Sequence, residues 1–155
     1  MELHPQRFDL AALVREVVTA MQTLSEKHRL LLRVDGPALV DADRNQIEVV
    51  LTHLIDNAIR YSPKGGDVEA TVAKGDGQVV VAVKDQGIGI PEERQRHVFE
   101  PFFQIQPAIA GYGGMGLGLY ISKEILQRHG GRIWFESKEG QGSTFYFSLP
   151  VPSPR

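Results

Sequence analysis

Glycine is concentrated in one part of this chain. Of its 16 glycines, seven fall between Gly87 and Gly118. Because glycine loses more conformational freedom on folding than any other residue, such a cluster indicates special backbone angles or the close approach of a ligand. A flexible loop is the alternative, so the cluster has to be placed among the predicted helices and strands before its meaning can be judged.

The composition is that of an ordinary globular chain of 155 residues. Hydrophobic residues make up 42% and charged residues 23%, and the formal net charge is −2, which excludes a protein that coats polyphosphates by bulk charge. There are no cysteines, so disulfides, thiolate metal sites and a cysteine nucleophile are excluded. No apolar run approaches the roughly 20 residues of a membrane helix. We therefore expect neither nucleic-acid binding nor direct membrane contact.

Hydrophobic periodicity gives the order of the predicted elements. Helices are predicted over residues 8–28, 43–61, 91–97 and 115–129. Strands are predicted at 30–34, 38–40, 68–73, 79–83, 132–136 and 143–149, and a loop over 101–114. Helices and strands do not alternate regularly, which favours an α+β sandwich with helices on one face of a mixed, mostly antiparallel sheet.

The helix predicted over 43–61 carries a polar stripe beside its apolar one. His53, Asn57, Arg60 and Tyr61 are spaced to share one helix face. Asparagine is a weak helix former. Its place in mid-helix, with a cation one turn on, indicates an oxygen ligand for Mg²⁺ beside an anion contact. A solvated polar face is the alternative, and the spacing alone does not decide between the two.

An acidic residue leaves the strand predicted at 79–83 and is followed by alternating glycines. Asp85 would present a fixed carboxylate beside the exposed backbone of Gly87 and Gly89, which suits recognition of an exocyclic amine on a flat ring. The alternative is a strand-end turn in which the aspartate pairs with its own backbone. Taken alone, this motif is a weak signal.

The last predicted helix opens on further glycines. Free N–H groups at a helix start, with Gly116 and Gly118 clearing the side-chain volume, make a seat for an anion. Residues 111–116 also match the dinucleotide fingerprint G-x-G-x-x-G, but that motif requires a preceding strand. Residues 104–110 contain Pro107 and have no strand pattern, so the fingerprint is rejected.

Four blocks in this order resemble the ATP-binding catalytic domain of sensor histidine kinases, one of the Bergerat-type ATPases. Residues 54–63 resemble the N box, 85–90 the first glycine box, 99–103 the F box and 114–119 the second glycine box. The resemblance implies a two-layer Bergerat-type sandwich over residues 8–150, with a mobile ATP lid over about 103–114. It also implies that residues 1–7 end a linker from a dimerisation domain, and we expect 151–155 to be a disordered tail.

The resemblance implies roles for individual residues. Asn57 would bind the Mg²⁺ that bridges the phosphates, and His53 would lie near the metal without binding it. Asp85 would accept a hydrogen bond from the adenine amine. The other residues implied to contact ATP are Arg60, Tyr61, Gly87, Gly89, Ile90, Phe99, Gly114, Gly116, Leu117, Gly118, Leu119 and Thr144.

Two departures from the family pattern matter. His53 stands where relatives usually have asparagine and where the hydrolysing relatives have a glutamate base, so we expect little intrinsic ATP hydrolysis. Residues 104–115 contain no lysine or arginine, although many relatives place a cation there for the γ-phosphate. Arg60, Lys64, Lys123 or a partner domain are the candidates to replace that cation.

None of the five histidines is followed by an acidic residue, as the phosphoacceptor histidine of this family normally is. We therefore expect the chain to bind ATP and Mg²⁺ and to transfer the γ-phosphoryl group to a histidine on a dimerisation domain outside it. A response-regulator receiver domain would be the next acceptor, and the location would be cytoplasmic. The alternatives are an anti-sigma-type serine kinase with the same ATP site and an interaction module that has lost its nucleotide.

Overall fold

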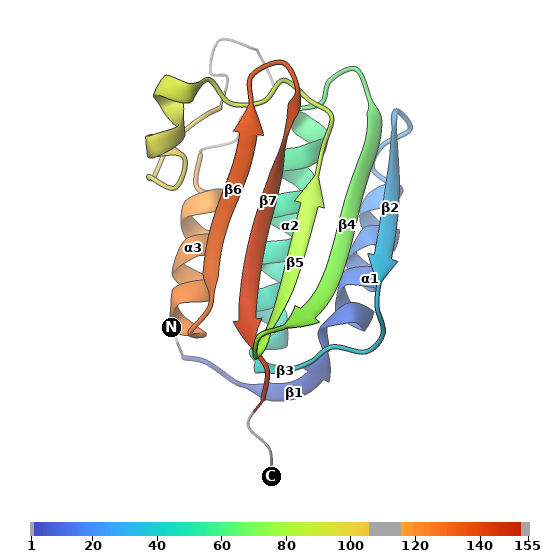
Figure 1. Cartoon of the computed structure of the whole chain (residues 1–155), viewed down its shortest axis with the longest axis vertical. Coiled ribbons are helices and arrows are strands. Elements are labelled where there is room, and N and C mark those ends of the chain that lie inside the picture. The colour runs from blue at the N-terminus through green and yellow to red at the C-terminus, as the bar shows by residue number, and fades with distance from the viewer. Residues whose placement is uncertain (1, 106–115, 153–155) are drawn as a thin grey trace.

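The computed structural model describes residues 2–105 and 116–152 (Figure 1). The order of helices and strands follows the predicted order, except that residues 6–9 form a strand that was not predicted, so the first helix starts at residue 10 and not at residue 8. The elements are β1 (Gln6–Asp9), α1 (Leu10–Gln22), β2 (His28–Val34), β3 (Leu39–Ala42), α2 (Arg44–Arg60), β4 (Gly66–Gly75), β5 (Gln78–Lys84), the short 3-10 helix η1 (Glu92–His97), α3 (Gly118–Arg128), β6 (Arg132–Lys138) and β7 (Gly142–Pro150).

The fold has two layers. The main sheet has the strand order β2-β4-β5-β7-β6, in which β2 and β4 run parallel and the other neighbours are antiparallel. Helices α1, α2 and α3 lie together on one face of this sheet (Figure 1), and β1 and β3 pair separately at one end. This confirms the predicted α+β sandwich with a mixed, mostly antiparallel sheet.

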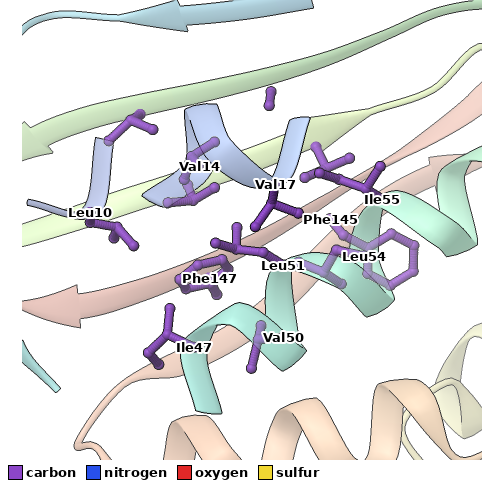
Figure 2. Close-up of a cluster of buried hydrophobic side chains, with 14 of the residues drawn as sticks. Leu10, Val14, Val17, Ile47, Val50, Leu51, Leu54, Ile55, Phe145 and Phe147 are labelled. Carbon is purple, nitrogen blue, oxygen red and sulfur yellow. The ribbon is translucent and has the colours of Figure 1, made fainter. Parts of the chain in front are cut away.

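The core lies between the helices and the sheet. The helical stripes of α1 and α2 meet there, and Phe145 and Phe147 of β7 pack beneath them (Figure 2). Burying a side chain of this size stabilises the fold by roughly 1.5–3 kcal/mol. Helix α2 also packs against α3, and residues of its polar stripe line a cleft together with the start of that helix.

Two further predicted helix boundaries were wrong. Helix α1 ends at Gln22 and not near residue 28. The Gln22 side chain bonds the loop that follows, because its amide N–H groups donate to the carbonyls of Ser25 and His28. Helix α3 starts at Gly118, because Gly116 has a φ of +74°, which is outside the helical region. Asp9 caps α1 by accepting the N–H of Ala11, and Asp43 caps α2 by accepting the N–H of Gln46.

The predicted domain ends fall partly within the described structure. Strand β1 begins at Gln6, so pairing with β3 reaches into the segment expected to be linker. At the other end, the N–H of Val151 donates to the Gly77 carbonyl, while residues 153–155 lie outside the described part. Among the described residues, none of the helices has the length and apolar character needed to span a bilayer.

Candidate functional site

A cleft of about 350 Å³ opens between the polar stripe of α2 and the start of α3. Residues 103–105 form its third side, and they are called the wall below. The cleft thus brings the predicted metal and phosphate residues of α2 together with the second glycine block. Its lining comprises His53, Asp56, Asn57, Arg60, Tyr61, Phe103, Gln104, Ile105, Gly116, Leu117, Gly118, Leu119 and Ile121.

Helix α2 presents a carboxamide and a cation to this cleft one turn apart. Asn57 lines the cleft and is partly exposed, so its amide oxygen is accessible. The Arg60 Nε lies 2.8 Å from Asp56 Oδ2, and both side chains are about two-fifths exposed. An exposed pair of this kind is worth about 0–1 kcal/mol, so an anion of higher charge can compete with Asp56 for the Arg60 guanidinium.

Tyr61 closes the end of α2 and ties it to the wall. Its side chain is buried, and its hydroxyl accepts a hydrogen bond from the backbone N–H of Ile105. Burial raises the pKa of Tyr61 above its ordinary value, although the Ile105 N–H and two nearby arginines oppose the shift. Tyr61 is therefore neutral at physiological pH and holds the wall against the helix.

His53 packs on the first residue of α3. A Cβ on Gly118 would lie 3.3 Å from the His53 ring, and the His53 Nδ1 lies 3.4 Å from the Ser122 hydroxyl. Burial lowers the pKa of His53, and this outweighs the opposing effects of the Gly118 backbone and Asp56. The imidazole is therefore neutral at pH 7.

The residue two positions before α3 has to be glycine for steric reasons. At Gly116 a Cβ would lie 2.6 Å from the carbonyl carbon of Phe102, and the positive φ is strained for any other residue. The first N–H groups of a helix have no partner within it, and those of α3 begin at the edge of the cleft. This arrangement suits a phosphate group.

Asp85 directly follows β5 and is not among the residues that line the cleft. Its Oδ1 accepts hydrogen bonds from the N–H groups of Gly87, at 2.9 Å, and Ser143, at 3.2 Å. Among the described residues, its Oδ2 accepts none. Desolvation raises the pKa of Asp85 to about 6, although both hydrogen bonds oppose the shift. A buried carboxylate with one unused oxygen fits the recognition of an amine.

The first glycine block is fixed to the end of α2. A Cβ on Gly87 would lie 1.9 Å from the carbonyl oxygen of Tyr61, and the same oxygen accepts the N–H of Ile88 at 2.9 Å. Side-chain-free backbone therefore passes directly over the residue that borders the cleft. Tyr61 therefore contacts the first glycine block through its carbonyl and lines the cleft with its side chain.

Other predicted contact residues lie further from the cleft. Gly89 packs against the backbone of Lys138, and Ile90 is fully buried. Phe99 packs edge-on against Phe135, with the ring centroids 5.8 Å apart, so it serves the core. Gly114 and the rest of the predicted lid beyond Ile105 lie outside the described residues.

Thr144 is separated from Asp85 by the pleat of the sheet. It pairs with Lys84 and Glu136 in the neighbouring strands, and its side chain bonds Tyr146 on the face that the helices leave open. Its neighbour Ser143 is the residue that contacts Asp85, and the sequence prediction missed it. No side-chain pattern could have found it, because the contact comes from the backbone N–H of Ser143.

The donor set fits a nucleotide with Mg²⁺. The amide oxygen of Asn57 is a suitable ligand for a hard cation. The start of α3 and the partly exposed Arg60 suit phosphate, and Asp85 beside Gly87 suits an amine-bearing ring. Asp56, which the sequence prediction did not include, adds a carboxylate to the α2 side of the cleft.

Known proteins resemble the chain over nearly its whole length. The adaptive-response sensory kinase SasA of Crocosphaera subtropica is 39% identical over 97% of this chain, and the sensor histidine kinase WalK of Bacillus subtilis is 38% identical over 86%. The chain spans 40% and 23% of those two proteins. The solved catalytic domain of the histidine kinase ThkA matches with a TM-score of 0.82 at 32% identity, covering 97% of this chain and 96% of that domain.

The family of histidine kinase-, DNA gyrase B- and HSP90-like ATPases matches residues 42–153. That region contains the α2 stripe, both glycine blocks and Asp85, which are the parts of the site described above. The chain therefore belongs to this ATPase family, and within it the chain corresponds to the ATP-binding catalytic domain of sensor histidine kinases.

Proposed function

We propose that the chain binds ATP with Mg²⁺ and presents the γ-phosphate to a histidine on a dimerisation domain outside this chain. The observation that carries the proposal is the cleft in which Asn57 and Arg60 face the start of α3, with the Gly87 backbone packed against the Tyr61 carbonyl at the end of α2. A receiver domain of a response regulator would take the phosphoryl group next. We place the reaction in the cytoplasm, as the resemblance implies.

Different residues bind the adenine base and the phosphates of ATP. Asp85 accepts a hydrogen bond from the adenine amine, and Gly87 lets the ring approach the backbone. Arg60 and the N–H groups at the start of α3 hold the phosphates. Asn57 provides an oxygen ligand for Mg²⁺, which when bound neutralises part of the phosphate charge. Phosphoryl transfer depends mostly on positioning and charge stabilisation, so a domain that holds ATP in this way supplies half of a kinase.

Hydrolysis by water is not the favoured outcome. A general base for hydrolysis would stand one turn before Asn57, where this chain has His53. The His53 ring is neutral and packs against Gly118. Its Nδ1 faces the Ser122 hydroxyl, and no carboxylate is among the hydrogen-bond partners that the structure gives this ring. We therefore propose slow intrinsic ATP hydrolysis.

Calorimetric titration with ATP and ADP, each with and without Mg²⁺, tests the proposal. We expect saturable binding of both nucleotides and tighter binding when Mg²⁺ is present. A sensor-kinase dimerisation domain added to the ATP complex should then acquire phosphate on its histidine. Failure of the folded chain to bind either nucleotide would overturn the proposal and favour an interaction module that has lost its nucleotide.

A further inference from the structure

A second arginine contacts the wall of the cleft. Arg94 belongs to η1, and its Nη2 donates a hydrogen bond to the carbonyl of Gln104. The same guanidinium lies over the Phe103 ring, with its carbon 5.0 Å from the ring centroid. Arg94 therefore contacts two consecutive residues that line the cleft.

The wall that Arg94 holds connects the two helices of the site. The N–H of Ile105 bonds the Tyr61 hydroxyl at the end of α2. On the other side, the Phe103 carbonyl oxygen lies 2.6 Å from the position that a Cβ on Gly116 would take. A change in the position of the wall would therefore alter the cleft at both α2 and the start of α3.

Arg94 forms no ion pair with a carboxylate in the described part of the chain. Its Nε is buried and has no hydrogen-bond partner among the described residues. An unpaired buried N–H on a cation is costly, so its retention calls for a reason. Its positive charge also opposes the rise in the pKa of Tyr61, which places it electrostatically near the cleft.

A missing cation elsewhere in the site explains why the buried charge of Arg94 is retained. Residues 104–115 contain no lysine or arginine, so that segment offers no cation to a phosphate chain. We propose that Arg94 is a positioning residue for the phosphate end of bound ATP, because it fixes the wall at the cleft and adds positive charge behind it. This inference rests on the proposed function, and it adds a residue that the four sequence blocks do not single out.

Two substitutions separate charge from packing. Arg94→Gln keeps an N–H donor for the Gln104 carbonyl but removes the charge, and Arg94→Lys keeps the charge but loses the planar guanidinium. Arg96→Ala is the matched control, because Arg96 is an exposed arginine of the same short helix whose Nε contacts His97. Each variant is first checked for its folded state by circular dichroism and thermal melting.

The measurement is calorimetric affinity for ATP, ADP and AMP with Mg²⁺. We expect Arg94→Gln to weaken ATP by about tenfold, the effect of losing one charged contact, and to leave AMP unchanged. Arg94→Lys should lie between the wild type and Arg94→Gln for ATP, because its charge remains while the planar guanidinium over Phe103 is lost. Arg96→Ala should match the wild type with all three nucleotides.

Each failure has a distinct meaning. Equal loss of ATP and AMP in Arg94→Gln would show a merely structural role and overturn the inference. The inference is also overturned if Arg94→Gln behaves as Arg96→Ala does, or if Arg94→Lys is as weak as Arg94→Gln. A wild-type chain that binds no ATP would instead defeat the proposed function.

Discussion

Asp85 is buried at the end of β5, and desolvation raises its pKa to about 6. The ordinary pKa of the unfolded chain is 3.8, so folding favours the protonated carboxyl. The stability that this group contributes is present below about pH 4 and is lost as pH rises through the folded pKa. At neutral pH the charged form costs at most on the order of 3 kcal/mol, which implies a functional reason for retaining it.

Asp85→Asn should separate function from stability. The amide keeps an acceptor for the Gly87 and Ser143 N–H groups but lacks the negative charge that holds the adenine amine. We expect ATP to bind more weakly by roughly 1–3 kcal/mol, while melting at pH 8 shifts upward because no buried charge remains. Calorimetry with ATP and GTP checks the binding, and Asp76→Asn in the exposed β4–β5 turn is the control. An equal loss for both nucleotides would count against recognition of the base.

The same carboxyl predicts how binding depends on pH. Because the ionised form accepts the adenine amine, ATP affinity should rise as pH increases through about 6 and level off above 7. Titrations between pH 5 and 8 measure this, and Asp85→Asn should flatten the profile. A variant profile that kept the wild-type slope would assign the effect to another group, with His53 the first to examine.

Asn57→Ala tests the metal ligand. The substitution removes one amide oxygen from the cleft and no core contact, so the fold should be unchanged. We expect the ratio of ATP affinities with and without Mg²⁺ to fall to about one, because the protein no longer contributes to holding the cation. Asn45→Ala, on the exposed first turn of α2, is the control. An unaltered response to Mg²⁺ in calorimetry would refute the assignment.

At the scale of elements, the start of α3 and its end make a natural comparison. Gly116 and Gly130 both have positive φ, +74° and +70°, so alanine at either should cost about 1–2 kcal/mol of stability. Only at Gly116 does a Cβ meet other atoms, at 2.6 Å from Phe102, while at Gly130 nothing lies within 4 Å. Gly116→Ala should therefore lose ATP affinity and Gly130→Ala should retain it. Thermal melting and calorimetry measure the two effects, and equal nucleotide affinities would contradict this view of the cleft.

Hydrophobic periodicity predicted a helix or strand accurately where contacts within that segment decide its ends. The Asp43 cap and the apolar stripe of α2 placed that helix to within a residue at each end. The end of α1 was missed because the Gln22 side chain bonds residues farther along the chain, which no periodicity records. The strand boundaries differed by a few residues for the same reason, since pairing partners come from elsewhere in the chain.

The candidate site shows the same division. Asn57, Arg60 and Gly116 were found from spacing and motif, and the structure places them around one cleft. Ser143 and Arg94 were missed because their partners lie outside their own elements. The N–H of Ser143 bonds Asp85 on the neighbouring strand's side, and the guanidinium of Arg94 bonds the carbonyl of Gln104 in the wall. Pairing and side-chain direction decide such contacts, and neither is written in a single segment of sequence.

On the scale of the whole molecule, the histidines already have structural partners or unsuitable neighbours. His28 is buried between Ser25 and Ser62, and His129 accepts the Asp43 N–H while its other nitrogen faces the Ile125 carbonyl. Neither ring is presented to the cleft. His53 does line the cleft, but its ring packs against Gly118 of α3, and the residue after it is Leu54 and not an acid.

This arrangement predicts that the chain binds ATP without phosphorylating itself. Incubation with Mg²⁺ and ATP labelled at the γ-phosphate should leave no acid-labile label on the protein, even at saturating nucleotide. Addition of a sensor-kinase dimerisation domain should produce label on that domain alone, and its His→Gln variant is the control. Transfer needs an acceptor histidine activated by a neighbouring acid, and no histidine in this sequence is followed by one. Base-stable, acid-labile label on the chain by itself would show that one of its own histidines reaches the γ-phosphate, and the division of the kinase between two domains would then be wrong.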